Sequence, residues 1–247
     1  RQPAGLPPRG GGPRLFAQTI PKGRKNTMVS IAIDGPAGAG KSSICTRLAQ
    51  ELHYLHIDTG ALYRAVGLFV LRQNKNPADP TDVLPLLPQI HIDLRFEAGE
   101  QRILLNGEDV SEASAAASAV SALPEVRAYL LEQQRSLARQ YNVIMDGRDI
   151  GTVVLPQATI KIYLTAAPEE RARRRWLEQQ QKGIKESYED VLAAVIKRDY
   201  DDSHRAAAPL RQAEDAWLCD STHLDFEGTV QAILAYIRQR IGEVPCR

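Results

Sequence analysis

Five short apolar segments recur along this chain, and helical patterns separate them. The segments are residues 29–33, 54–57, 143–145, 160–164 and 216–219. Strands that are buried on both faces have this composition, and their alternation with helices is typical of a parallel sheet covered on both sides. The sequence therefore predicts an α/β fold with a five-stranded parallel sheet flanked by helices. Binding sites in such sheets lie at the carboxyl ends of the strands.

One stretch interrupts this alternation. Between Ile90 and Val110 the apolar residues first alternate with polar ones, and a later apolar run, residues 103–105, leads into the pair Asn106-Gly107. A period of two and an Asn-Gly turn are typical of antiparallel strands. The sequence predicts a small antiparallel insert at about residues 88–112, inside a domain that spans residues 29–247.

The first 28 residues differ in composition from the rest. They carry six of the 31 Lys and Arg residues and no acidic residue, and they include the run Gly10-Gly11-Gly12. Such a segment cannot bury a core, so we expect a flexible basic tail or leader that ends at Met28. The other residues have 25 basic against 30 acidic side chains. This mildly acidic balance argues against a nucleic-acid partner.

The cysteine content and the hydropathy of the chain bear on the cellular compartment of the protein. The three cysteines, Cys45, Cys219 and Cys246, form no CxxC pair, so we expect reduced thiols in a cytoplasmic protein. No run of 18 apolar residues occurs, and no membrane partner is expected. We also expect a monomer. The histidines are scattered without a Cys-His or zinc-ligand spacing, and a structural role is expected for His56.

A glycine-rich motif follows the first predicted strand, and residues 35–42 fit G-x-x-x-x-G-K-[ST]. Glycines let backbone N–H groups turn towards phosphate oxygens, and the next helix adds its positive amino end. Lys41 is expected to act on the β- and γ-phosphates of ATP, and the Ser42 hydroxyl is expected to hold Mg²⁺. The candidate cofactor-binding residues are Gly35, Pro36, Ala37, Gly38, Ala39, Gly40, Lys41, Ser42 and Ser43.

Acidic residues and arginines follow the second and third predicted strands. Asp58 and Thr59 end one strand, and Arg64 lies on the first turns of the next helix. The other strand leads into Asp146-Gly147-Arg148-Asp149. A planar guanidinium suits bidentate capture of a phosphate. Asp146 occupies the position of a carboxylate that orients Mg²⁺, so the candidate metal residues are Ser42 and Asp146.

Two further arginine-rich segments follow. Pro168 begins a predicted helix in which Arg171 shares a face with Arg174 and Arg175. One interpretation is a solvated basic face. The other is a helical lid, over about residues 168–190, in which Arg171 and Arg174 are catalytic and close over the transferring phosphoryl group. On the next predicted helix, Arg198 and Arg205 share one side, with Asp202 beside them.

These charges predict phosphoryl transfer. The reaction brings several anionic groups together, and Arg, Lys and Mg²⁺ can neutralise them without a covalent nucleophile. Two alternatives stay open: a kinase for another acceptor, such as UMP or a small metabolite, and a nucleotide-dependent switch. A GTPase switch needs a guanine reader of the Asn-Lys-x-Asp type, and residues 74–77, Asn-Lys-Asn-Pro, lack its acid.

Six motifs of this chain are IAIDGPAGAGKSS, IDTGALYRA, MDGRDIGTVV, ERARRR, KRDYDDSHRAAAPL and LCDST. Together they resemble those of bacterial cytidylate kinases, over nearly all of residues 31–237. The resemblance implies a P-loop kinase that transfers the γ-phosphate of ATP to CMP or dCMP, with the insert near the monophosphate. It implies that Arg64, Arg148 and Arg205 hold the acceptor phosphate and that Asp149 helps to recognise cytosine. The other substrate-binding residues implied are Thr59, Tyr63, Arg198 and Asp202.

One difference from the family pattern concerns the segment that contacts the cytosine base. Between Ser111 and Ala115 the family carries a segment with Ile-Arg-Thr, whose Arg contacts the cytosine, but here only Glu112-Ala113-Ser114 intervenes. Either this Arg has been lost, or further residues belong at this point. We expect the second, because a segment that closes on the acceptor should be mobile. With the Arg absent, discrimination between CMP and UMP should be weak.

Overall fold

The computed structural model describes residues 16–17, 28–97, 100–111 and 116–242. Its main sheet has the strand order β3-β7-β2-β8-β9, and all neighbouring strands in it are parallel. The prediction of a five-stranded parallel sheet is therefore confirmed. The strands are β2 (Ser30–Asp34), β3 (Leu55–Asp58), β7 (Val143–Gly147), β8 (Ile160–Thr165) and β9 (Trp217–Asp220).

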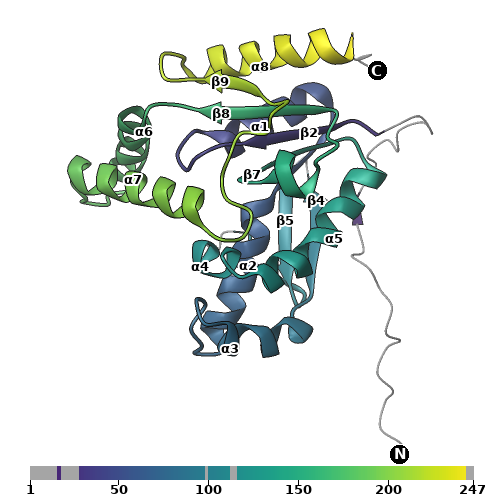
Figure 1. Cartoon of the computed structure of the whole chain (residues 1–247), viewed down its shortest axis with the longest axis vertical. Coiled ribbons are helices and arrows are strands. Elements are labelled where there is room, and N and C mark those ends of the chain that lie inside the picture. Colours follow the sequence, from purple (N-terminus) through teal and green to yellow (C-terminus); the bar gives the residue numbers. More distant parts are fainter. Residues whose placement is uncertain (1–15, 18–27, 98–99, 112–115, 243–247) are drawn as a thin grey trace, which may run out of the picture.

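Four long helices cover the two faces of this sheet (Figure 1). They are α1 (Lys41–Leu52), α2 (Thr59–Arg72), α5 (Pro124–Gln140) and α8 (Phe226–Ile241). Successive side chains of a strand point to opposite faces. Accordingly Ile31 and Ile33 belong to the core shared with α1 and α8, whereas Ala32 belongs to the core shared with α2 and α5. Burial on both faces explains why the strand segments are almost entirely apolar.

The chain reverses its direction across the sheet at β2, which has β7 on one side and β8 on the other. A crevice at the carboxyl ends of the strands is expected at such a switch point. The glycine-rich motif directly follows β2, so the fold places it at this crevice.

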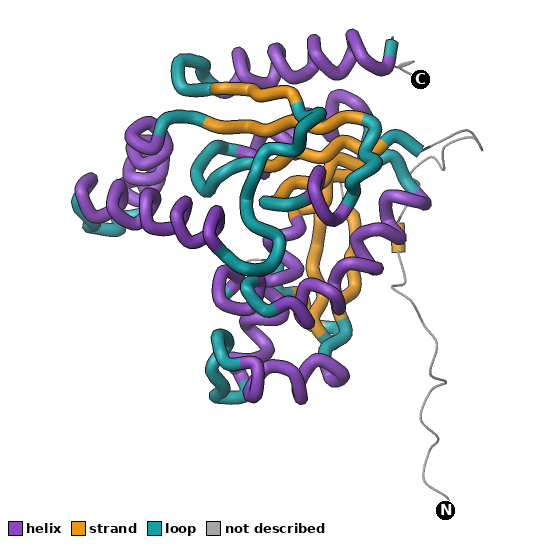
Figure 2. Tube along the Cα trace, viewed as in Figure 1, coloured by secondary structure: helices purple, strands orange, loops and turns teal. Residues whose placement is uncertain are grey.

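A second, smaller sheet runs across the direction of the main strands (Figure 2). Its antiparallel strands are β4 (Ile92–Glu97), β5 (Glu100–Leu105) and β6 (Glu108–Asp109). The Asn106-Gly107 turn has positive φ at both residues, 51° and 89°. The predicted antiparallel unit is present in the expected part of the chain.

The small sheet also has a fourth strand, β1 (Phe16–Ala17), which pairs in parallel with β4. This pairing differs from the expectation that the first 28 residues are flexible throughout. The other residues before Met28 lie outside the described part of the chain.

Of the remaining helical elements, α4, α6 and α7 carry residues that line the cavity at this crevice. Helices α6 and α7 lie side by side and project from the main sheet (Figure 1). They share a small core of Ala172, Val191 and Val195. No helix in the described ranges combines the length and hydropathy needed to cross a membrane. These elements are α3 (Pro80–Val83), the 3₁₀ helix η1 (Leu84–Gln89), α4 (Ala117–Ser121), the π-helical turn η2 (Ile150–Val154), α6 (Pro168–Gln181) and α7 (Tyr188–His204).

Candidate active site

The glycine-rich loop between β2 and α1 has a backbone that requires glycine at both ends. A Cβ atom at Gly35 would lie 1.9 Å from the carbonyl oxygen of Leu164, and Gly35 has a φ of +152°. Gly40 caps α1 with a φ of 81°. The loop therefore curls tightly over the amino end of a helix, the arrangement that presents backbone N–H groups to an anion.

Lys41 begins α1 and is buried beneath this loop. Its Nζ donates hydrogen bonds of 2.8 Å to the carbonyl oxygens of Gly35 and Pro36. Burial and, to a smaller extent, the charge of Arg148 lower the pKa of Lys41 to about 7. A phosphate placed in the loop would offset both effects, because it brings negative charge next to the ammonium group.

This pKa predicts proton uptake when a phosphate ligand binds. At pH 8 the free protein holds Lys41 mostly neutral, and a bound phosphate should raise its pKa and restore the charge. Calorimetric titration with ATP at pH 8, in buffers of different ionisation enthalpy, should show uptake of roughly one proton. Lys41→Met should abolish this proton uptake. Heats that do not depend on the buffer in the unaltered protein would contradict the prediction.

Two oxygen-bearing side chains meet beside Lys41. Ser42 Oγ donates a hydrogen bond of 2.9 Å to Oδ2 of Asp146, which lies near the carboxyl end of β7. The other carboxylate oxygen lies 2.7 Å from Nε2 of His56. The two residues predicted to bind metal are therefore together. Thr59 Oγ1 donates to the carbonyl oxygen of Asp146, at 2.7 Å, and so holds the end of β7.

A cavity of about 350 Å³ opens beside the phosphate loop. Arg148 lines it and donates from Nε to Oδ2 of Asp202 at 2.8 Å, while Arg64 is held by Asp58 at 2.7 Å. All eight residues predicted to bind substrate line this one cavity. They are Thr59, Tyr63, Arg64, Arg148, Asp149, Arg198, Asp202 and Arg205.

Two of these arginines have buried N–H groups without a hydrogen-bond acceptor among the described residues: Nε of Arg198 and Nη2 of Arg205. Burial lowers the pKa of both guanidinium groups, and neighbouring arginines lower it further. An Asp149 oxygen lies 3.8 Å from Arg205 Nη2, which is too far for a hydrogen bond. Buried donors of this kind indicate that an anion belongs in the cavity.

Arg127 is a cavity residue that sequence reasoning missed. It lies in the first turn of α5 and donates from Nη2 to Oδ2 of Asp149 and from Nη1 to the carbonyl oxygen of Ser121. Its guanidinium carbon is 5.5 Å from the centre of the Tyr63 ring. Pro124 marks the start of α5 in the sequence, but the Asp149 partner lies 22 positions away, and no local pattern joins the two.

The structure places the two predicted catalytic lid arginines outside this cavity. Arg171 is buried and uses its donors on the carbonyl oxygens of Ala37 and Ala166 and on both carboxylate oxygens of Asp199. Arg174 donates to the carbonyl oxygen of Ser221 at 2.7 Å. Both therefore tie α6 to its neighbours. Arg175, on the same helix, does line the cavity.

A second cavity lies on the other flank of the phosphate loop and shares Gly40 and Ser43 with the first. Its lining includes the apolar side chains of Ile44, Leu224 and Phe226. Ala39 and Arg174 also line it. The phosphate loop thus lies between a cationic cavity and a partly apolar one, and a phosphate-bearing ligand could extend from the loop into either.

Asp34, at the end of β2, joins the phosphate loop to the far side of the site. Its Oδ1 and Oδ2 accept hydrogen bonds of 2.7 Å from the backbone N–H groups of Ile150 and Gly151. Burial raises the pKa of Asp34 to about 6, although these two hydrogen bonds act in the opposite direction. The turn that follows Asp149 is therefore anchored to the strand that carries the loop.

A family model described as cytidylate kinase matches residues 31–239 of this chain. The chain belongs to the cytidylate kinase family. A curated cytidylate kinase from Caldicellulosiruptor bescii is 51% identical over 212 residues, covering 83% of this chain and 94% of the relative. One from Caldicellulosiruptor saccharolyticus is 50% identical over 220 residues, covering 87% and 97%. An uncharacterized protein from Eubacterium ventriosum has a TM-score of 0.51 at 12% identity, covering 86% of this chain and 100% of its own. This last likeness concerns the fold alone.

The segment that departs from the family pattern lies between Ser111 and Ala115. The full sequence runs continuously through Glu112-Ala113-Ser114, so the expectation of further residues at this point is wrong. These three residues lie outside the described part of the chain. The site nevertheless has an Arg beside Asp149, because Arg127 supplies it from α5.

Proposed function

We propose that this chain transfers the γ-phosphate of ATP to CMP or dCMP, giving ADP and CDP or dCDP. The observation that carries the proposal is the cluster of guanidinium groups next to the phosphate loop, with buried donors that lack acceptors. Family membership supports the same acceptor, because the relatives are named for cytidylate.

The acceptor phosphate would lie among Arg148, Arg198 and Arg205. A buried N–H group without a hydrogen-bond acceptor costs about 1–3 kcal/mol. Phosphate oxygens would accept hydrogen bonds from the unpaired N–H groups of Arg198 and Arg205. Arg64 is already oriented by Asp58 and would add a fourth positive charge. Because these groups are held in place before the ligand arrives, little ordering is needed when it binds.

The acceptor base would lie against Asp149, Arg127 and Tyr63. Cytosine offers an amine donor at C4 and acceptors at N3 and O2, which a carboxylate and a guanidinium can match. Uracil has a carbonyl at C4, which would face the carboxylate as a second acceptor. A site that hydrogen-bonds both kinds of atom rejects the wrong base because buried polar groups are left unpaired. The site geometry therefore favours CMP over UMP.

Arg127→Ala should lower the preference for CMP over UMP. Loss of one buried hydrogen-bonding partner costs about 1–3 kcal/mol, so the ratio of kcat/KM values should fall roughly 5- to 150-fold. The measurement is kcat/KM for both acceptors at saturating ATP. Arg139→Ala is the matched control, since Arg139 lies on the same helix and is exposed. If the ratio of kcat/KM values is unchanged in Arg127→Ala, the base does not bind at this end of the cavity.

We further propose that Ser42 and Asp146 hold Mg²⁺. Both offer oxygen atoms, the ligands that this ion takes in proteins, and they lie 2.9 Å apart on the wall of the cavity. When bound, the ion would neutralise charge on the β- and γ-phosphates of ATP. Lys41 would supply a further positive charge from beneath the loop.

ATP would place its phosphates in the loop formed by residues 35–43 and its base in the second cavity. The apolar side chains of Ile44, Leu224 and Phe226 suit a planar ring, and Gly40 and Ser43 border both cavities. Donor and acceptor would then approach the loop from opposite flanks. The γ-phosphate would lie between them, facing the acceptor phosphate.

Arg175 would reach the transferring phosphoryl group, in place of Arg171 and Arg174. Arg175 lines the acceptor cavity, whereas the donors of Arg171 are used on backbone and on Asp199. In this proposal Arg171 positions the phosphate loop through the Ala37 carbonyl oxygen and couples it to the lid helices. The lid itself would comprise about residues 168–190.

The kinase domain would span residues 29–247, with the insert at about 88–112 beside the acceptor. Support for the insert comes from Gln101 of β5, whose Oε1 accepts from the Asp58 backbone N–H at 2.9 Å. Asp58 directly precedes Thr59 of the cavity. We propose a cytoplasmic monomer without a nucleic-acid or membrane partner. The acidic balance of residues 29–247 supports the absence of a nucleic-acid partner.

An assay of ADP release with ATP and a panel of acceptors tests the proposed function. CMP and dCMP should give the fastest turnover, with UMP slower and shikimate without effect. Faster turnover with UMP or shikimate would assign the enzyme to another acceptor. ATP hydrolysis that no acceptor stimulates would favour the nucleotide-dependent switch.

A further inference from the structure

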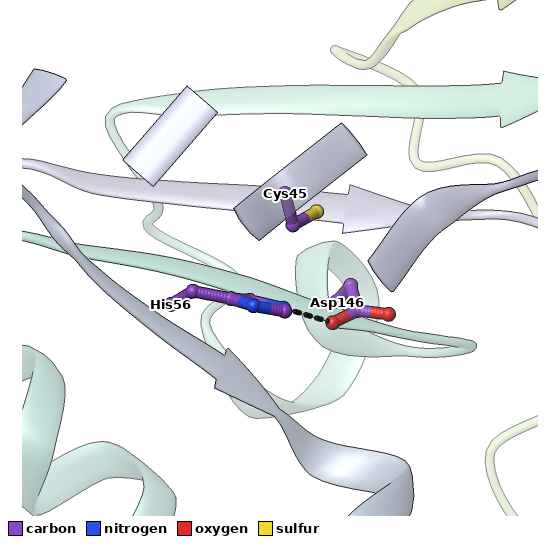
Figure 3. A group of neighbouring side chains, drawn as sticks. All are labelled: Cys45, His56 and Asp146. Carbon is purple, nitrogen blue, oxygen red and sulfur yellow. Dashed lines mark hydrogen bonds and ion pairs between the residues drawn. The ribbon is translucent and has the colours of Figure 1, made fainter. Parts of the chain in front are cut away.

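Asp149 lies beyond the part of β7 that the main sheet holds. The strand ends at Gly147, whereas Asp146 lies inside it, with its carboxylate facing the imidazole of His56 (Figure 3). The backbone position of Asp149 therefore depends on the residues that follow it, which form the π-helical turn η2. Short π-helical turns are rare in proteins and are often found at functional sites.

The backbone of Asp149 is tied to the carboxyl end of η2, and Arg135 of α5 holds that end. The Asp149 carbonyl oxygen accepts hydrogen bonds from the backbone N–H groups of Val153 and Val154, at 2.8 and 3.1 Å. The carbonyl oxygens of the same two residues accept from Arg135. Its Nη2 donates to Val153 and its Nε to Val154, both at 2.9 Å. Because the donors of a guanidinium form a rigid fork, they fix the orientation of both carbonyl groups.

We propose that Arg135 is a positioning residue for acceptor selectivity, which holds Asp149 in place through η2. This inference rests on the proposed function, in which Asp149 and Arg127 bind the cytosine base. Arg135 lies on the same helix as Arg127, about two turns further along and roughly 12 Å away along the axis. Arg127 holds the Asp149 side chain, and Arg135 holds the turn that fixes the Asp149 backbone. One helix thus orients the carboxylate in two ways.

Arg135 separates selectivity from ATP binding better than the residue at the other end of η2 does. That residue is Asp34, which accepts from the N–H groups of Ile150 and Gly151. Asp34 directly precedes Gly35 of the phosphate loop, so its replacement would disturb the ATP side as well. Arg135 belongs to the described part of the chain and lines neither of the two cavities. An effect of Arg135 on the acceptor must therefore be transmitted through the residues that it binds.

Hydrogen exchange measured by NMR on the free protein tests the anchoring without any substrate. Arg135→Met keeps the long apolar part of the side chain and removes both donated hydrogen bonds. The amides of Val153 and Val154 should exchange at least about 10-fold faster, the change that corresponds to loss of one hydrogen bond to a charged group. Arg139→Ala is the control and should leave this exchange unchanged, since Arg139 lies on the same helix with 58% of its side chain exposed. Unchanged exchange in folded Arg135→Met would overturn the proposal.

Kinetics with CMP and UMP at saturating ATP test the selectivity. In Arg135→Met the ratio of kcat/KM values for CMP and UMP should fall about 10-fold, because misplacement by about 1 Å costs up to roughly 100-fold. The KM for ATP should stay unchanged, whereas a purely structural role would lower turnover with both acceptors alike. Arg135→Lys keeps the charge and one donor, so it should recover part of the ratio. It also provides the test if Arg135→Met does not fold. A ratio that is unchanged in the folded variants would overturn the proposal.

The double variant Arg127→Ala/Arg135→Met tests whether both arginines act through the same carboxylate. If they do, the two effects should not multiply, and the double variant should have about the ratio of Arg127→Ala alone. Effects that multiply would overturn the proposal. A ratio that falls in Arg127→Ala but not in folded Arg135→Met would refute this inference alone. A ratio that is unchanged in both would refute the proposed position of the base, and the selectivity role of Arg135 with it.

Discussion

Replacement of Lys41 by alanine should lower kcat for CMP phosphorylation by about 100-fold or more, because one fixed charge at the transferring phosphate is lost. The thermal midpoint should change little by comparison. The two hydrogen bonds that Lys41 Nζ makes are to carbonyl oxygens of the phosphate loop, which can turn to water when the side chain is removed. The loss should thus concern catalysis rather than folding.

The measurement is kcat at saturating ATP and CMP, with a thermal melt of the same preparation. Lys197→Ala is a suitable control, since Lys197 is 76% exposed and pairs with Asp201 on the surface of α7. If the turnover of Lys41→Ala is within threefold of that of the unaltered protein, Lys41 takes no part in the transfer step. A variant that does not fold would contradict the expectation that the loop tolerates the change.

Arg205→Ala should raise the KM for CMP by roughly 30-fold or more and leave the KM for ATP nearly unchanged. Truncation of one partner in a buried charge pair costs about 2–5 kcal/mol. Arg205 is suited to this test because its buried Nη2 makes no hydrogen bond to the described protein and is free for the ligand. Within the described residues, Arg205 donates a hydrogen bond from Nε to the Ala208 carbonyl oxygen, at 2.7 Å.

Steady-state kinetics with each substrate varied in turn would separate the two KM values. Arg211→Ala provides the control, since Arg211 lies six positions further along and is exposed. Arg148→Ala should show the same rise in the KM for CMP with a lower thermal midpoint, because it leaves Asp202 without its 2.8 Å partner. If the KM for ATP rises in Arg205→Ala, this residue binds ATP rather than the acceptor.

The sequence predicted the features of this protein that depend on local pattern. All five strands of the main sheet were predicted within one or two residues, since burial on both faces leaves an unmistakable apolar run. The phosphate loop was equally clear, because its function depends on consecutive backbone groups. The eight residues predicted to bind substrate share one cavity because they follow strands or lie on helices that meet at one edge of the sheet.

The features that were missed depend on contacts between distant parts of the chain. Arg127 meets Asp149 only because α5 packs beside η2, and neither helix period nor composition reveals that contact. The face of α6 that carries Arg171 was predicted to point at the substrate. In the structure Arg171 donates to the Ala37 carbonyl oxygen and to Asp199, and Arg175 lines the cavity. Sequence spacing fixes which side chains share a helix face, but tertiary contacts decide where that face points.

The adjacency of β2 and β7 has a consequence for acceptor size. The phosphate loop follows β2 and the Arg148-Asp149 pair follows β7, with Asp34 and Gly147 directly opposite in register. Hydrogen-bonded neighbouring strands lie about 4.8 Å apart, and side chains cannot alter that spacing. The spacing of β2 and β7 therefore fixes the distance between the phosphate loop and the Arg148-Asp149 pair. An acceptor with one more phosphate would be too long for this distance, so side-chain replacements alone should not convert the enzyme into a nucleoside diphosphate kinase.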